Sequence, residues 1–190
     1  MRIIILALLL PVVAIAQKEK NAAVGWRVNA ASGVITGESA AKPLYQFSGG
    51  ITYARFFSGI GIGYDKYRFN TIPVFADWRM DVDHSRQTYL YVQPGYGFTA
   101  GNNPEEPEYG RVADRLKGGF SLDAGIGYRL AVGKRNGFLL SAGYGLKYMV
   151  HEKTYLYCAT CDTDPVTDTY RYRFGRILLK AGWEFGSRGR

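Results

Sequence analysis

The sequence predicts an all-β fold, an eight-stranded antiparallel up-and-down transmembrane β-barrel, and three observations support this prediction. An export leader is expected at the start of the chain. Eight later segments alternate apolar and polar residues with a period of two, as half-buried strands do. In these segments the apolar side chains are large, whereas the opposite face carries small or charged residues.

Residues 1–16 have the pattern of a secretory signal peptide. An apolar run follows Arg2, and Ala14 and Ala16 form the A-x-A pattern of a cleavage site. The run is too short for a transmembrane helix, which needs about 20 apolar residues. We therefore expect residues 1–16 to be removed and residues 17–190 to form a single barrel domain.

Alternation is clearest in the segments 72–82 and 120–132. In the first, Asp77, Arg79 and Asp81 alternate with apolar residues, so that one face is apolar and the other is mostly charged. Helical spacing would mix the two sets. Six further segments show the same pattern: residues 24–36, 45–55, 59–65, 89–98, 138–148 and 176–185.

The direction of the alternation decides between a soluble and a membrane barrel. A narrow soluble barrel packs its large apolar residues inside and exposes its charges. Here the small and charged face suits a barrel interior, and the bulky apolar face suits a lipid-facing exterior. The sequence therefore predicts a barrel with lipid outside and a polar filling.

The connections between strands give a second test, because membrane barrels alternate short periplasmic turns with longer outer loops. Short turns are expected at residues 55–58, 83–86 and 133–136. Outer loops are expected at residues 38–43, 68–71, 100–117 and 151–167, of which the second is unusually short.

Nine charged side chains are predicted to point into the lumen. They are Asp77, Arg79, Asp81, Asp123, Arg129, Lys147, Arg176, Lys180 and Glu184. They would line a selective pore or form a salt-bridged plug. Eight strands enclose a space that side chains can just fill, so the plug is favoured.

Outward aromatic residues are expected to form girdles at the two membrane interfaces, although a carbohydrate-stacking surface is an alternative. The candidates are Trp26, Tyr53, Trp78, Tyr96, Tyr128, Tyr148, Trp183 and Phe185.

Cys158 and Cys161 are the two cysteines of the chain. Outside the cytoplasm such a pair most often forms a disulfide, which is the favoured interpretation. A metal pair assisted by His151, Asp162 or Asp164 and a redox dithiol are alternatives, but zinc normally takes four protein ligands. We expect no metal site and no cofactor.

No catalytic constellation is evident. His84 is expected in a periplasmic turn and His151 at the start of an outer loop. No outward-facing serine falls beside either histidine in the predicted register, so we do not expect an enzyme.

The net charge is +8, which is compatible with nucleic acid, with acidic lipid headgroups or with solubility alone. Export argues against nucleic acid. Contact with the phosphates of a membrane leaflet and a simply solvated surface both stay open.

The strand motifs resemble small outer-membrane β-barrel proteins of Bacteroidota. The resemblance rests on Gly59-Ile60-Gly61-Ile62-Gly63-Tyr64-Asp65, on the segment 71–79, on Gly125-Ile126-Gly127-Tyr128 and on Gly182-Trp183-Glu184-Phe185. It implies a bacterial outer-membrane location, with outer-membrane lipid and the barrel-insertion machinery as partners. It also implies an insertion signal that ends on Phe185, although residues 186–190 follow it.

The leading hypothesis is a non-enzymatic barrel with a filled lumen that supports the cell envelope or presents its outer loops to a surface partner. A porin-like narrow channel for small solutes or ions is the alternative. A lipid-modifying membrane enzyme and a soluble ligand carrier rank lower.

Overall fold

The computed structural model describes residues 24–36, 41–66, 69–100, 111–133, 135–155 and 166–187. Within these ranges, no helix is long and apolar enough to cross a membrane. The predicted leader and both cysteines lie outside the described residues.

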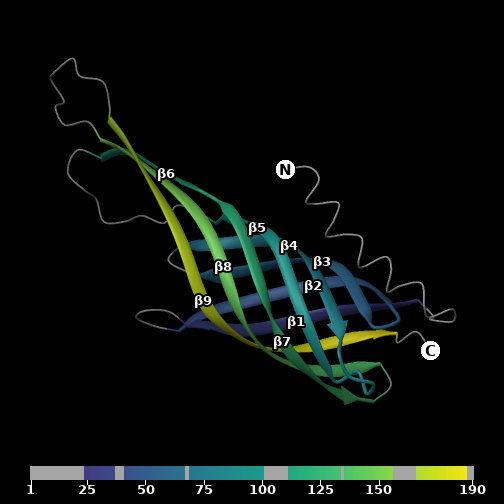
Figure 1. Cartoon of the computed structure of the whole chain (residues 1–190). Coiled ribbons are helices and arrows are strands. Elements are labelled where there is room, and N and C mark those ends of the chain that lie inside the picture. The colour runs from purple at the N-terminus through teal and green to yellow at the C-terminus, as the bar shows by residue number, and fades with distance from the viewer. Residues whose placement is uncertain are drawn as a thin grey trace.

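Within the described residues, all the regular structure is β-strand (Figure 1). The strands are β1 (Gly25–Thr36), β2 (Lys42–Tyr53), β3 (Phe56–Lys66), β4 (Asn70–Asp81), β5 (Thr88–Thr99), β6 (Arg111–Lys117), β7 (Gly119–Val132), β8 (Asn136–Tyr155) and β9 (Val166–Ser187).

The strands close into a barrel. Each strand of the wall pairs antiparallel with its neighbours, and β9 returns to pair with β1 along Trp26↔Ser187 to Thr36↔Ile177. β6 extends β7 beyond Gly118 and pairs with β8, so the closed wall contains eight strands. A Cβ on Gly118 would lie 2.0 Å from the carbonyl oxygen of Gly97, which explains a glycine at this interruption. The predicted eight-stranded antiparallel barrel is confirmed.

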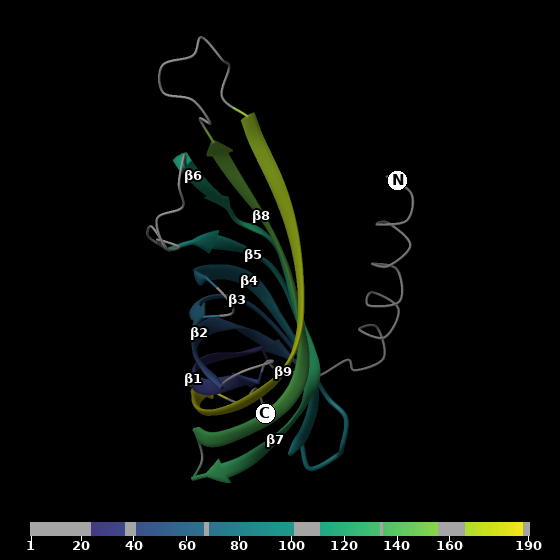
Figure 2. The same ribbon diagram turned by 90° about the vertical axis from the view of Figure 1, so that its left-hand side faces the viewer.

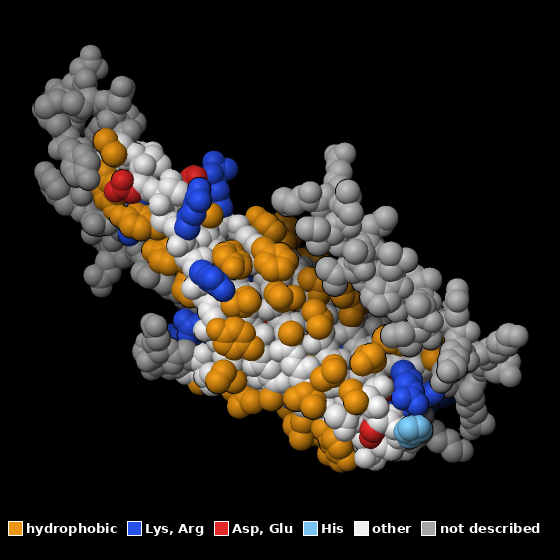
Figure 3. All heavy atoms as spheres, in the orientation of Figure 1, with side chains coloured by type: hydrophobic (Ala, Val, Ile, Leu, Met, Phe, Trp, Pro, Cys, Tyr) orange, Lys and Arg blue, Asp and Glu red, His pale blue; other side chains and the backbone are white. Residues whose placement is uncertain are grey.

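Exposure alternates along the strands as the sequence predicts. In β4, for example, Asp77, Arg79 and Asp81 are buried, whereas Trp78 and Met80 are exposed. Exposed large apolar side chains occur on every strand of the wall and form an apolar belt, whose members on the face drawn in Figure 3 are orange. Charged side chains are therefore buried inside the barrel and apolar side chains are exposed on its outer surface. A lipid environment favours this arrangement.

Short turns join the strands at one end of the barrel, which we call the turn end; the opposite end is the loop end. Ala54 and Arg55 form the first turn, with Ala54 in the left-handed region at a φ of 54°. The predicted turns are thus correctly placed, but two bounds are wrong. Residues 56–58 begin β3, and Asn136 begins β8.

At the loop end, three strands run far past the barrel rim (Figures 1 and 2). β8 has 20 residues and β9 has 22, whereas a tilted strand needs about 9–11 to span a bilayer. Together with β6 they form a three-stranded sheet, which we call the projection.

The projection corrects the predicted outer loops. Residues 111–117 are strand β6, and residues 151–155 and 166–167 belong to β8 and β9. His151 is therefore not in a loop but buried in a strand. Residues 42–43 and 70–71, also expected in loops, begin β2 and β4. Polar residues occur on both faces of the projection, so the alternation that marks a membrane strand is lost there.

Candidate functional site in the barrel lumen

Four charged side chains form an ion-pair cluster near the turn end. Arg129 donates from Nη1 to Asp81 Oδ1 at 3.0 Å and from Nη2 to Glu184 Oε2 at 3.3 Å. The Nη1 atom also donates to the carbonyl oxygen of Arg86 at 2.8 Å. Arg27 lies 3.9 Å from Asp81 and 3.7 Å from Glu184. Two arginines and two carboxylates thus neutralise one another across β1, β4, β7 and β9.

A second cluster occupies the middle of the lumen around Arg79. Its Nη2 and Nε donate to the two carboxylate oxygens of Asp77 at 2.6 and 3.0 Å. Ser48 donates to Asp77 at 2.6 Å, and Arg79 Nη1 donates to Asn29 Oδ1 at 3.3 Å. This bidentate, charge-assisted geometry is the strong form of an arginine–carboxylate pair.

The ring of Tyr89 lies between these two clusters. The guanidinium carbon of Arg79 is 5.6 Å from its centroid, and that of Arg129 is 5.3 Å away. Glycine at position 127 makes room for the ring, because a Cβ there would lie 2.2 Å from Tyr89 Cζ. The two charged clusters are therefore packed together through one aromatic side chain.

Toward the loop end, Lys180 is the centre of a third polar group. Its Nζ donates to Gln93 Oε1 at 3.0 Å and to Gln46 Oε1 at 3.1 Å, and it lies 4.4 Å from the ring centroid of Tyr91. Gln46 in turn donates to Asp123 Oδ2 at 3.4 Å. Asp123 is half-buried and is linked to Lys180 through this glutamine.

Lys147 forms the fourth polar group with residues of β3 and β4. Its Nζ lies 2.6 Å from both carboxylate oxygens of Asp65 and 2.7 Å from Thr71 Oγ1. The hydroxyl of Thr71 also donates to Asp65. All three side chains are buried, so the ion pair is well shielded from solvent.

Apolar and aromatic side chains cover the polar filling at the loop end. Ile35, Leu44 and Leu178 are fully buried, and Phe174 packs against them. Beyond them, the ring of Phe69 lies 5.6 Å from that of His151 and 6.0 Å from that of Tyr172. This second group continues the core of the barrel into the projection.

Buried polar and charged side chains crowd the described part of the lumen, and its charges balance. Among the described residues it contains five basic side chains (Arg27, Arg79, Arg129, Lys147 and Lys180) and five acidic ones (Asp65, Asp77, Asp81, Asp123 and Glu184). A cavity between the Arg79 and Lys180 groups has a volume of about 30 Å³, roughly the space of one water molecule. A path for hydrated ions needs far more room.

Eight of the nine residues predicted to fill the lumen take part in these four clusters. The ninth, Arg176, is half-buried near the rim, where its guanidinium lies over the ring of Phe174 at 5.8 Å. The prediction omitted Arg27 and Asp65. Both stand on the inward face of recognised strands, so the period-two register, extended to β1 and β3, would have found them.

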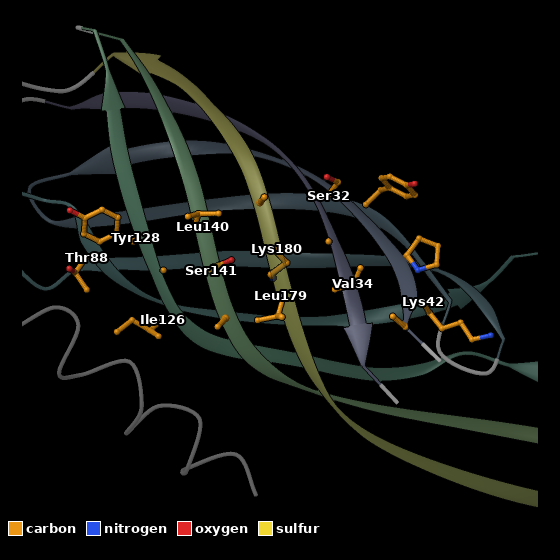
Figure 4. Close-up of a pocket in the computed structure, with 17 residues that line it drawn as sticks. Ser32, Val34, Lys42, Thr88, Ile126, Tyr128, Leu140, Ser141, Leu179 and Lys180 are labelled. Carbon is orange, nitrogen blue, oxygen red and sulfur yellow. The ribbon is translucent and has the colours of Figure 1, made fainter. Parts of the chain in front are cut away.

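The predicted girdle residues all point outward. Trp183 is half-exposed beside Phe138, with ring centroids 6.2 Å apart, and the other seven are exposed. A broad hollow on the same outer wall crosses β7, β8, β9, β1 and β2 (Figure 4). Val34, Ile126, Leu140 and Leu179 give it an apolar lining, so it belongs to the lipid-facing surface and not to the lumen.

Comparisons with known proteins bear on the fold alone. No family model matches the chain, and no curated protein matches it. The crystal structure of the outer membrane protein OprG from Pseudomonas aeruginosa matches with a TM-score of 0.52 at 9% identity, over 89% of this chain and 98% of that one.

Two further structures match less closely. A de novo designed transmembrane β-barrel gives a TM-score of 0.42 at 14% identity, over 89% of this chain and 98% of the other. The solid-state NMR structure of the outer membrane protein AlkL in lipid bilayers gives 0.47 at 12% identity, over 88% and 91%. Together with the register and the closed wall, the likeness to OprG shows that the chain has the fold of a small outer-membrane β-barrel.

Proposed function

We propose that this protein is a non-conducting barrel of the bacterial outer membrane that anchors the projection at the cell surface. The observation that carries the proposal is the lumen, where balanced ion pairs leave a cavity of about 30 Å³ among the described residues. Buried charges that are paired and hydrogen-bonded are stable in a narrow interior, whereas a conducting pore needs a continuous hydrated path. The barrel then serves as a support, and interactions with other molecules take place outside the membrane.

The outward apolar belt and the likeness of fold support the outer-membrane location. The leader expected at residues 1–16, the family resemblance and the use of the barrel-insertion machinery remain predictions that fit this location. A role without enzymatic activity is part of the same proposal.

The projection supports a surface-interaction role. β1 pairs with β9 only from Ile177 to Ser187, so no described strand pairs with residues 166–171 of β9 on the side away from β8. An edge of this kind can accept an additional extended strand. The projection would therefore offer backbone hydrogen bonds to a surface partner in addition to side-chain contacts.

Planar-bilayer recording of the purified mature protein tests the proposal. We expect no steady single-channel steps. An Asp77→Ala, Arg79→Ala double variant serves as the positive control. It removes an ion pair without changing the net charge and widens the middle of the lumen, so it shows whether conduction through an open path would be detected. Steady steps from the unmodified protein would favour the alternative, a narrow channel for small solutes or ions.

A further inference from the structure

A basic patch lies on the outer face of the projection, directly beyond the lipid-facing belt. It consists of Arg115, Lys117, Arg171 and Arg173, all of which are exposed. In Figure 3, lysine and arginine side chains (blue) gather where the orange belt meets the projection. These four side chains take no part in the ion pairs of the lumen, so the filling of the barrel does not account for their charge.

Strand register brings these side chains together. Lys117 pairs with Val150, and Val150 pairs with Arg171, so these three residues form one row across β6, β8 and β9. Neighbouring strands lie about 4.8 Å apart, so the backbones of Lys117 and Arg171 are about 10 Å apart. Arg173 follows two positions along β9 and faces the same side.

The patch is strongly positive in the part of the chain that the structure describes. Glu152, which forms an ion pair with Lys117 at 2.5 Å, is the acidic side chain among its described neighbours on this face. Arg171 and Arg173 have Val150 and Tyr148 as cross-strand partners on β8. Their charges are therefore available to an external anion.

Aromatic residues fix the height of the patch relative to the membrane. The guanidinium of Arg173 lies 5.8 Å from the ring centroid of Tyr148, and that ring lies 6.4 Å from the ring of Phe120. Tyr144 covers the glycine between Arg173 and Ile177, since a Cβ on Gly175 would lie 2.0 Å from its hydroxyl oxygen. Tyrosine at the edge of an apolar belt marks the interface, so the arginines stand at the level of the lipid headgroups.

We infer that the basic patch binds the phosphate groups of a phosphorylated lipid of the outer leaflet. Arginine matches phosphate with two parallel hydrogen bonds, and two guanidiniums two positions apart on one strand suit a headgroup with more than one phosphate. The inference rests on the proposed membrane location but is independent of whether the lumen conducts. The excess positive charge of this face is then explained by contact with phosphate groups of the surrounding membrane.

Binding of lipid A, a diphosphorylated glycolipid, to the detergent-solubilised mature protein tests the inference by native mass spectrometry. We expect Arg171→Gln, Arg173→Gln to weaken binding about thirtyfold, the contribution typical of two basic residues at an anionic surface. Arg171→Lys, Arg173→Lys keeps both charges but loses the paired guanidinium hydrogen bonds, so its affinity should lie between those of the unmodified protein and the glutamine variant. The matched control, Arg55→Gln, Arg135→Gln, removes two charges at the turn end and should leave binding unchanged.

Three results would overturn the inference: equal binding of enzymatically dephosphorylated lipid A, equal losses in the patch and turn-end variants, or full displacement by millimolar inorganic phosphate. Heat-modifiable migration on a denaturing gel shows that each variant is folded. Failure to bind lipid in a folded, non-conducting barrel rejects this inference and leaves the proposed function standing.

Discussion

Asp77 and Arg79 stand two residues apart on β4, and their side chains pair with each other inside the barrel at 2.6 and 3.0 Å. Residues two apart on a strand share a face, and these two share the lumen with their charges matched. Neither would be stable there alone, because a buried charge without its partner costs several kcal/mol.

Breaking this pair should therefore destabilise the barrel. We expect Arg79→Met to lower the free energy of unfolding by about 3–5 kcal/mol, since Asp77 is left buried and unpaired. The measurement is denaturant unfolding in lipid vesicles. Combining Arg79→Met with Asp77→Leu should recover part of the loss, and strict additivity of the two single effects would contradict a direct pair.

An ion pair in the lumen should contribute more to the free energy of unfolding than an ion pair on the projection. Arg129→Gln removes a buried cation from two carboxylates and should cost about 3–5 kcal/mol. Lys117→Gln removes the exposed partner of Glu152 on the projection and should lower the free energy of unfolding by no more than about 1 kcal/mol. Equal effects of the two substitutions on unfolding would argue against a shielded lumen.

The alternation of residues was sufficient to predict the fold and most of the lumen. The face occupied by Asp77, Arg79 and Arg129 follows from a period of two, which holds wherever one side of a strand meets lipid. The pairing of these charges did not follow, because it depends on strand stagger around the closed wall. Asp81, for example, meets Arg129, 48 positions away in the chain.

The projection could not be predicted by the same reasoning. Beyond the membrane neither face of a strand meets lipid, so residues such as Glu152 and Lys153 interrupt the pattern without interrupting the strand. Buried His151 was missed for this reason. Backbone pairing between β8 and β9 continues to Tyr155 and Val166 regardless of polarity.

Gly127, which lies against the ring of Tyr89, should be required for the packing of side chains in the lumen. In Gly127→Ala the new Cβ would lie 2.2 Å from Tyr89 Cζ, so the ring must leave its place between two guanidiniums. We expect a loss of about 1–3 kcal/mol in unfolding free energy. Gly97→Ala is the matched inward control, because its Cβ would make ordinary contact with Lys147 Cε at 3.5 Å. A similar loss in both variants would mean that strand propensity, not the ring, sets the effect.

The turn at Asp83 should give the barrel a small acid-sensitive contribution to stability. Hydrogen bonds from the Ser85 hydroxyl and from the backbone N–H groups of Thr88 and Gln87 hold the pKa of Asp83 below its usual value of 3.8. A lowered pKa stabilises the fold above the unfolded value, and the benefit disappears as the pH falls through the folded one.

We therefore expect Asp83→Ala to be less stable than the unmodified protein at pH 7, and the difference to shrink as the pH falls below 3.8, the usual pKa of this carboxyl group. Unfolding midpoints measured across this range check the prediction. A difference that persists unchanged at low pH would show that the carboxylate charge is not the cause.

Thiol accessibility in the middle of the lumen tests the closed barrel most directly. Ser48→Cys is made with Cys158 and Cys161 replaced by serine, and the folded protein in vesicles is treated with a small cationic thiol reagent. Because Ser48 is 3% exposed within the Arg79 cluster, we predict no modification over a time in which Ser85→Cys, in a turn, reacts completely. Rapid modification at position 48 would reveal a water-filled path and contradict the filled lumen.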